Sequence, residues 1–279
     1  MERVVAAAWD AINGKLMKPS ISPLHRQYQD SSNFRKRAAL VGRFSTNRYS
    51  WYRWVYDQFY PLPDDAAVLE LGCGPGSLWK RNLDRIPVNW KIVLSDFSAG
   101  MLRDCQQNLG SAVSRFLSCQ LDASRLPFRA ARFDAVIANM MFYHVEDRAA
   151  ALRDIRRVLR ADGHFYATTT GTEYMRELNA VATRILQVPR YAPSAQRFGL
   201  ENGIEQLRAE FANVELRRYE NELRVNEVQP LIDYFASMEP LIAPRAERWD
   251  ELRDYFQRQI DERGEIVIPI EVGMLIAHL

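Results

Sequence analysis

Residues 68–76 read Val-Leu-Glu-Leu-Gly-Cys-Gly-Pro-Gly, so an apolar run leads directly into three closely spaced glycines. A helical pattern begins at about Ser77. This order predicts a buried strand, a tight turn and a helix, the arrangement that brings backbone close to a nucleotide-type ligand. Glycine is required at 72, 74 and 76 because a Cβ there would collide with the ligand or forbid the turn dihedrals.

A second motif follows at the end of the next expected strand, residues 91–95, where the chain places Asp96. An acidic side chain at this point can accept two hydrogen bonds from a ribose diol, a device shared by NAD-binding and S-adenosylmethionine-binding folds. The glycine spacing separates the two classes in part. It is G-x-G-x-G here, with Pro75 between the last two glycines, whereas the dinucleotide fingerprint is G-x-G-x-x-G.

Five motifs in order then carry a resemblance to a known family. They are the loop 68–76, Leu94-Ser-Asp-Phe-Ser98 with Met101, Leu121-Asp-Ala123, Phe133-Asp-Ala-Val-Ile137 and Arg157-Val-Leu-Arg-Ala-Asp-Gly163. Over about residues 66–170 the chain resembles class I S-adenosylmethionine-dependent methyltransferases. It is most similar to the small-molecule branch that includes ubiquinone/menaquinone methyltransferases (methyltransferase type 11), and a natural-product methyltransferase fits the same pattern.

The resemblance implies S-adenosyl-L-methionine as cofactor and an α/β, Rossmann-like fold. This fold has a seven-stranded, mainly parallel sheet with an antiparallel last strand, an N-terminal helical lid and a helical insertion between strands five and six. In the family, the first acidic residue organises the loop around the methionine moiety, and later residues cover the adenine ring or bond its amino group. The residues that the resemblance places at the cofactor are Glu70, Gly72, Gly74, Gly76, Asp96, Phe97, Met101, Asp122, Ala123 and Asn139.

Composition narrows the function classes. The chain has 279 residues, a mass of 32.3 kDa and a net charge of +2, with basic residues spread along its length. One α/β domain with additions is expected, without the clustered basic stripe of a nucleic-acid-binding protein. The three cysteines form no C-x-x-C pair, which favours a reducing cytoplasm, and charges near the N-terminus argue against a signal peptide or a membrane span.

Two alternatives to a methyltransferase remain, an oxidoreductase and a non-catalytic binding module with the same fold. The last lysine is Lys91, so the second half of the chain cannot supply the Tyr-x-x-x-Lys pair of a short-chain dehydrogenase. A non-catalytic module would be expected to lose its cofactor residues, and all of them are present here.

The chain divides into residues 1–63, expected to form a helical lid or oligomerisation segment, and residues 64–279, the cofactor domain. Alternating strand and helix patterns over 66–169 predict a parallel sheet with helices on both faces. A helical insertion at about 172–212 precedes a strand at about 214–224, and Gly273 is expected to form a bulge in the last strand. An apolar face at Val4–Ile12 is too short to be a stable helix alone and predicts a homo-oligomer.

The segment Asn139–His144 follows the fourth central strand, where ligands dock in open α/β sheets. Family members acting on small molecules often carry a His-His pair here, and this chain has Tyr143-His144. We consider His144 a candidate general base or acceptor ligand; the alternative is a structural histidine. If it is a base, its loss removes a pH limb near 6.5, the ordinary histidine pKa of about 6.5. Asp147 is expected to cap the next helix.

Aromatic residues in the lid and the insertion predict an apolar or ring-containing acceptor. Packing within their own helices is the competing interpretation. The sequence leaves C-, O- and N-methylation open, and the scattered histidines and cysteines suggest no metal site. The acceptor candidates are Tyr28, Tyr52, Tyr143, Tyr174, Tyr191 and Phe198.

Overall fold

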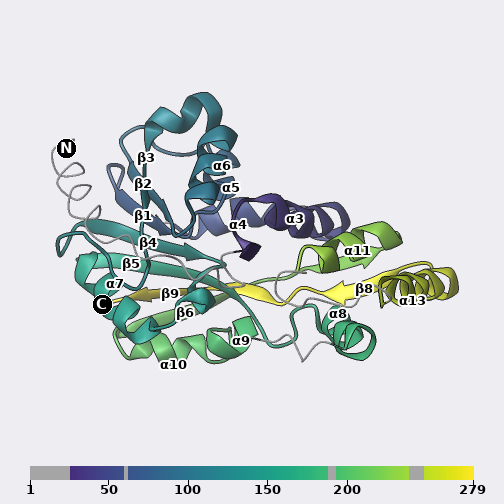
Figure 1. Cartoon of the computed structure of the whole chain (residues 1–279). Helices are drawn as coiled ribbons and strands as arrows, with labels where there is room; N and C mark the ends of the chain where they lie inside the picture. Colours follow the sequence, from purple (N-terminus) through teal and green to yellow (C-terminus); the bar gives the residue numbers. More distant parts are fainter. Residues whose placement is uncertain (1–25, 60–61, 188–192, 239–247) are drawn as a thin grey trace.

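The computed structural model describes residues 26–59, 62–187, 193–238 and 248–279. Its main feature is a seven-stranded sheet of order β3-β2-β1-β4-β5-β9-β6 (Figure 1). All neighbouring strands run parallel except β9, which pairs antiparallel with β5 and with β6. The strands of this sheet are β1 (Ala67–Leu71), β2 (Lys91–Asp96), β3 (Phe116–Gln120), β4 (Phe133–Asn139), β5 (Leu159–Thr170), β6 (Asn213–Tyr219) and β9 (Val272–His278).

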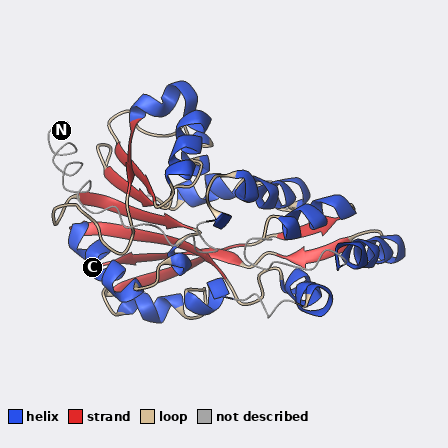
Figure 2. Cartoon of the chain, in the orientation of Figure 1, coloured by secondary structure: helices blue, strands red, loops and turns tan. Residues whose placement is uncertain are grey.

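The topology confirms the predicted Rossmann-like sheet with its antiparallel last strand. All five residues of β1 are buried, as expected for a central strand with both faces covered. Helices lie on both faces (Figure 2). One face carries α4 (Trp51–Asp57), α5 (Ser77–Lys80) and α6 (Ala99–Leu109), and the other carries α7 (Arg148–Val158), α9 (Pro193–Arg197) and α10 (Gly203–Arg208).

A second, smaller module lies beyond the carboxyl ends of the parallel strands (Figure 1). It has its own two-stranded antiparallel sheet and its own apolar core, which includes Leu223, Phe235 and Phe256. Its elements are α3 (Ser32–Phe44), α8 (Arg176–Val181) with the π-turn Ala182–Leu186, β7 (Glu222–Val225), α11 (Val228–Ala236), α13 (Arg248–Arg263) and β8 (Ile266–Pro269). The module therefore covers the edge of the sheet at which ligands of open α/β folds bind.

Two sequence expectations about the strands after residue 212 are wrong. The strand expected at 214–224 is interrupted at 220–221, because the Asn221 side chain there accepts hydrogen bonds from Ser45 Oγ at 2.8 Å and Asn47 N at 3.1 Å. Gly273 is not a bulge, since its register with both neighbouring strands is continuous. A Cβ at Gly273 would lie 2.5 Å from the carbonyl oxygen of Arg217, so glycine is needed for a close strand approach.

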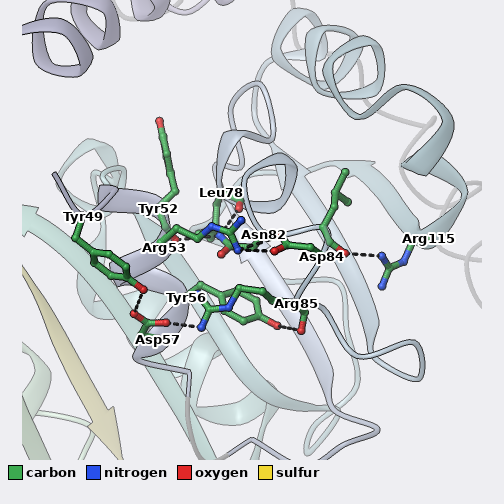
Figure 3. A network of polar contacts seen from close by, with 11 residues as sticks. Tyr49, Tyr52, Arg53, Tyr56, Asp57, Leu78, Asn82, Asp84, Arg85 and Arg115 are labelled. Atoms are coloured by element: carbon green, nitrogen blue, oxygen red, sulfur yellow. Dashed lines mark hydrogen bonds and ion pairs between the residues drawn. The ribbon is translucent and has the colours of Figure 1, made fainter.

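Polar contacts fix α4 against the segment that follows α5 (Figure 3). Arg53 donates to Asp84 at 3.0 Å, the Asn82 side chain donates to the carbonyl oxygen of Tyr52 at 3.0 Å, and Arg85 pairs with Asp57. These contacts hold α4, which belongs to the expected lid segment 1–63, against residues 82–85.

No helix in the described ranges is long and apolar enough to cross a membrane. The apolar face at Val4–Ile12 lies outside the described residues, so the predicted self-association remains a prediction.

Candidate functional site

The glycine loop follows β1 and turns in the left-handed region that favours glycine. Gly74 has a φ of +53°, and its N–H donates to Asp96 Oδ2 at 2.9 Å. A Cβ built on Gly74 would meet no protein atom within 4 Å. The backbone at Gly74 thus borders open space, which a ligand can approach more closely than any side chain would permit.

Asp96 lies at the carboxyl end of β2 and is anchored by backbone donors. Its Oδ1 accepts from Ser98 N at 2.8 Å while its Oδ2 accepts from Gly74 N. Burial raises the pKa of Asp96, and these N–H donors oppose the rise. The side chain is 9% exposed and keeps acceptor capacity for further donors. This geometry fits the predicted ribose contact, which stays a prediction.

Glu70 is buried within β1 and does not border open space. Its Oε2 accepts from Trp79 Nε1 at 2.6 Å, which holds α5 against the strand. Burial raises the pKa of Glu70 to about 8. The structure therefore places Glu70 as a residue that positions the loop, in line with the organising role that the resemblance implies.

The adenine candidates differ in exposure. Phe97 is 51% exposed, an uncommon state for so large an apolar ring, whereas Met101 is buried inside α6. Asp122 lies after β3, and its Oδ1 accepts from Ser124 N at 2.8 Å in a tight turn, with Ala123 buried between them. The structure brings these residues to the same sheet edge as Asp96, and an exposed aromatic ring there suits a flat heterocycle.

The end of β4 supplies the next part of the edge. Asn139 Oδ1 accepts from Thr168 Oγ1 at 2.7 Å, so its side chain is held by β5. Met140 follows with a φ of +55°, a left-handed conformation that is rare for residues other than glycine. Such backbone outliers concentrate at functional sites.

Tyr28 and His144 meet across this edge, although 116 residues separate them. The Tyr28 hydroxyl lies 3.1 Å from His144 Nε2, and the two rings are T-shaped with centroids 5.1 Å apart. Desolvation lowers the pKa of His144 to about 4, with smaller contributions from Arg197 and Arg37. Burial raises the pKa of Tyr28. Both partners are therefore uncharged at pH 7.

The segment that carries Tyr28 lies across the start of α6. A Cβ on Gly100 would be 1.8 Å from the carbonyl oxygen of Gln29, and Ser31 N donates to Asp104 Oδ2 at 2.8 Å. Residues 26–31 thus bridge from the end of β2 to the end of β4, over the region between Asp96 and His144. This is the placement expected of a lid.

The other acceptor candidates differ in burial and in location. Tyr52 and Tyr143 are half-buried at the edge, and Tyr174 is half-buried against the core of the small module. Phe198 is fully buried, with its ring 5.0 Å from that of Phe142, so it packs in the core and borders no open space. Tyr191 lies outside the described residues.

Sequence reasoning missed three arginines near His144. Arg148 and Arg197 donate to the carbonyl oxygen of Val145 at 2.8 and 3.2 Å, and the Arg37 guanidinium lies 5.6 Å from the centre of the Tyr28 ring. No local pattern distinguishes them from the other arginines of the chain, because they converge only through the tertiary fold.

A polar cavity of about 270 Å³ lies elsewhere, on β5, β6 and β9. Its lining includes His164, Asn213 and His278. Asn213 begins β6 and His278 ends the antiparallel β9, so the cavity lies toward the amino ends of the parallel strands. Ligands of open α/β sheets bind at the opposite edge, and we do not place the cofactor in this cavity.

The fold and the edge geometry define a class of protein: a doubly wound α/β domain with a glycine turn, an anchored acid and an exposed ring for a nucleotide-type cofactor. Residues 69–167 match the family model described as a methyltransferase domain. The chain is 34% identical over 128 residues to a malonyl-[acyl-carrier protein] O-methyltransferase of Geobacter sulfurreducens, covering 46% of this chain and 47% of the relative.

Two further matches agree. A ubiquinone/menaquinone biosynthesis C-methyltransferase of Xanthomonas oryzae is 36% identical over 117 residues, covering 41% of this chain and 46% of that protein. Among solved structures, the phosphoethanolamine N-methyltransferase 2 of Haemonchus contortus in complex with S-adenosyl-L-methionine has a TM-score of 0.59 at 16% identity, covering 95% of this chain and 60% of the other. This last likeness concerns the fold alone.

Residues 69–167 therefore match a methyltransferase domain, and this match, together with the named relatives, confirms the resemblance in the motifs to class I S-adenosylmethionine-dependent methyltransferases. The chain spans about half the length of the first curated relatives it matches, 47% and 46% of the first two. Gly74 with its open side, Asp96 and the exposed Phe97 ring fit the S-adenosyl-L-methionine that the resemblance implies, at the edge described above.

Proposed function

We propose that this protein transfers a methyl group from S-adenosyl-L-methionine to a small organic acceptor. The observation that carries the proposal is the Tyr28–His144 contact, because it closes residues 26–31 over the edge that holds the glycine loop and Asp96. When bound, the cofactor supplies an electrophilic methyl group. What the protein must add is alignment and exclusion of water.

The residues of the edge divide this work. Asp96 and the backbone at Gly74 hold the cofactor, and Phe97 covers its flat ring. The lid segment with Tyr28 separates the edge from solvent, while His144 and Tyr143 border the acceptor side. Asn139, bonded to Thr168, fixes the end of β4 between the two sides.

The acceptor side has an apolar component. Met140, Tyr174, Trp51 and Trp54 are partly buried and pack against the core of the small module. We propose that the ring or apolar body of the acceptor, as in isoprenoid or aromatic secondary metabolites, lies against these side chains. The relatives' names include both an O-methyltransferase and a C-methyltransferase, so we propose C- or O-methylation without choosing between them.

We propose that His144 orients the acceptor and is not its general base. A pKa of about 4 keeps the imidazole neutral but makes it a weak base, whereas an effective general base has a pKa near the working pH. We therefore no longer expect the pH limb near 6.5 in the rate, because burial lowers the pKa of His144 from its ordinary value to about 4.

Replacing His144 by glutamine is expected to lower kcat/KM by about 5- to 150-fold, the effect of losing a buried hydrogen-bond partner worth about 1–3 kcal/mol. The wild-type rate should stay flat between about pH 5.5 and pH 8, since His144 titrates below this range. Tyr28→Phe removes the same contact from the other side and should give a similar loss, not additive with the first. A general base would instead give a loss of about 10²- to 10⁴-fold and a pH limb.

The same shift predicts a pH-dependent stability. The folded pKa of His144 is lowered to about 4, below the ordinary value of 6.5, so the unfolded chain binds a proton that the folded chain refuses. The stability present above pH 6.5 is lost as the pH falls toward 4, by at most about 3 kcal/mol. Urea unfolding at pH 7.5 and pH 4.5 should show a larger loss for the wild type than for His144→Gln. Equal losses would contradict the buried, neutral imidazole.

Calorimetry tests the function directly. We expect the full chain to bind S-adenosylhomocysteine and not NADH, which separates a methyltransferase from an oxidoreductase. Transfer of a labelled methyl group to co-purifying or candidate acceptors then separates an enzyme from a binding module, which would bind the cofactor without turnover. We also propose that the protein is cytoplasmic and forms a homo-oligomer. Light scattering of the full chain and of a version lacking residues 1–16 tests the oligomer.

A further inference from the structure

Arg37 and Arg197 both lower the pKa of His144 in the Tyr28–His144 pair, and Arg148 shares a hydrogen-bond acceptor with Arg197. Arg148, at the start of α7, and Arg197, at the end of α9, donate to one carbonyl oxygen, that of Val145, at 2.8 and 3.2 Å. Arg37, from α3, lies over the Tyr28 ring and donates to the carbonyl oxygen of Ser237 at 3.3 Å. Three different elements thus direct positive charge to the acceptor side of the edge.

None of these three arginines forms an ion pair with a carboxylate in the described part of the chain. The ion pairs found there involve other arginines, such as Arg53, Arg85 and Arg160. The three are also half-buried, so water screens them less than it screens exposed side chains. A half-buried cation without a counter-charge is unfavourable.

The cations also act on one another and on their neighbours. Burial, with Arg197 as the charged contributor, lowers the pKa of Arg148, and Arg197 and Arg37 both disfavour protonation of His144. Two guanidiniums that share one carbonyl oxygen repel each other, and a neutral carbonyl compensates only in part. A bound anion would offset this repulsion with charge-assisted, bidentate hydrogen bonds.

We propose that Arg37, Arg148 and Arg197 bind an oxyanion group of the acceptor, a carboxylate or a phosphate, beside the Tyr28–His144 pair. This inference rests on the proposed function and specifies its substrate class. The acceptor then has two parts: an anionic group held by the arginines, and an apolar or ring-containing part that lies against Met140 and Tyr174.

The alternative is that these arginines only bond carbonyl oxygens and stabilise the fold. Arg115 provides an internal example of that role, since it donates to the carbonyl oxygens of Leu83 and Ile86 at 3.1 and 2.9 Å. It is a single guanidinium, and among the described residues no second arginine donates to either carbonyl. Arg115 is therefore a matched control, with the same kind of contacts but outside the acceptor side.

The experiment uses the full chain saturated with S-adenosylhomocysteine, with acetate and inorganic phosphate as separate probes at constant ionic strength. The ring resonances of His144 report binding by NMR; the chain has four histidines, and His144→Gln assigns the signal. We expect Arg197→Gln and Arg37→Gln each to raise the Kd of the bound anion about 10-fold or more. Arg197→Lys should retain part of the affinity, and Arg115→Gln should leave it unchanged.

The two probes distinguish the sources of the oxyanion. Tighter binding of acetate indicates a carboxylate acceptor, and tighter binding of phosphate indicates a phosphorylated one. If neither anion perturbs His144, or if Arg115→Gln weakens binding as much as Arg197→Gln, the proposal is overturned. Arg37→Gln gives an independent reading should Arg197→Gln fail to fold. Saturation with S-adenosylhomocysteine is measured first, so a failure of the proposed function is seen separately from a failure of the anion site.

Discussion

Replacing Gly74 by valine is expected to raise the Kd for S-adenosylhomocysteine by more than about 100-fold, equivalent to about 2.8 kcal/mol. In the free protein the new Cβ would meet no atom within 4 Å, so the valine side chain causes no clash and the variant can fold. It would occupy the open space next to the loop, where we place the cofactor. The φ of +53° also disfavours a β-branched residue.

Gly264 supplies the control for that backbone penalty. It also has a positive φ, +79°, and open space around its Cβ, but it lies between α13 and β8. Thermal unfolding should show comparable losses of stability for Gly74→Val and Gly264→Val. Calorimetry should show loss of binding for Gly74→Val alone. If both variants bind the ligand like the wild type, the cofactor does not lie against Gly74.

The parts of the fold that the sequence predicted are those encoded by short, contiguous patterns. In the run 68–76, apolar strand-forming residues are followed by glycines, and this order alone predicts a buried strand and a turn. The structure agrees, since these glycines have positive φ values. The antiparallel β9 came from the resemblance, because the loose alternation of residues 265–278 does not specify strand direction.

The errors lie where a distant residue decides the local structure. At the break after β6, Asn221 accepts hydrogen bonds from Ser45 and Asn47, which lie 176 and 174 residues away, and no local pattern near 220 signals this contact. Gly273 was interpreted as a bulge because glycine often marks one. The structure shows the other use of glycine in strands, close approach of a neighbouring backbone.

In the candidate site, too, residues marked by local sequence patterns were predicted, and contacts that depend on the tertiary fold were not. Asp96 was found because it ends its strand, so that the sheet itself carries it to the edge, and Asp122 was found from the position that the resemblance gives it. Tyr28 and His144 were named separately, and nothing in the sequence indicated that they touch. The charges near His144 were missed altogether, so the expected pKa was the ordinary one. Burial, which the sequence does not give, changed its predicted role.

Asp96→Ala is expected to weaken binding of S-adenosylhomocysteine by about 2–3 kcal/mol, or about 30- to 150-fold. The variant loses the proposed hydrogen bonds from the ribose hydroxyls to a carboxylate. It also leaves Gly74 N–H and Ser98 N–H without their acceptor, so the loop is less well ordered before binding. Part of the loss therefore comes from preorganisation and part from direct contact.

Asp154→Ala separates the loss of a backbone acceptor from the loss of a ligand contact. Asp154 Oδ2 accepts from Leu126 N at 2.6 Å, but its carboxylate lies on α7, on the other face of the sheet. Both variants should lose some thermal stability: Asp96→Ala leaves two backbone N–H groups without an acceptor, and Asp154→Ala leaves one and also removes the ion pair with Arg157. Only Asp96→Ala should lose affinity, and Asp96→Asn, which keeps one carbonyl acceptor, should fall between it and the wild type. An Asp96→Ala protein that folds and binds the ligand with wild-type affinity would remove this carboxylate from the cofactor site and leave its bonds to the loop as its whole role.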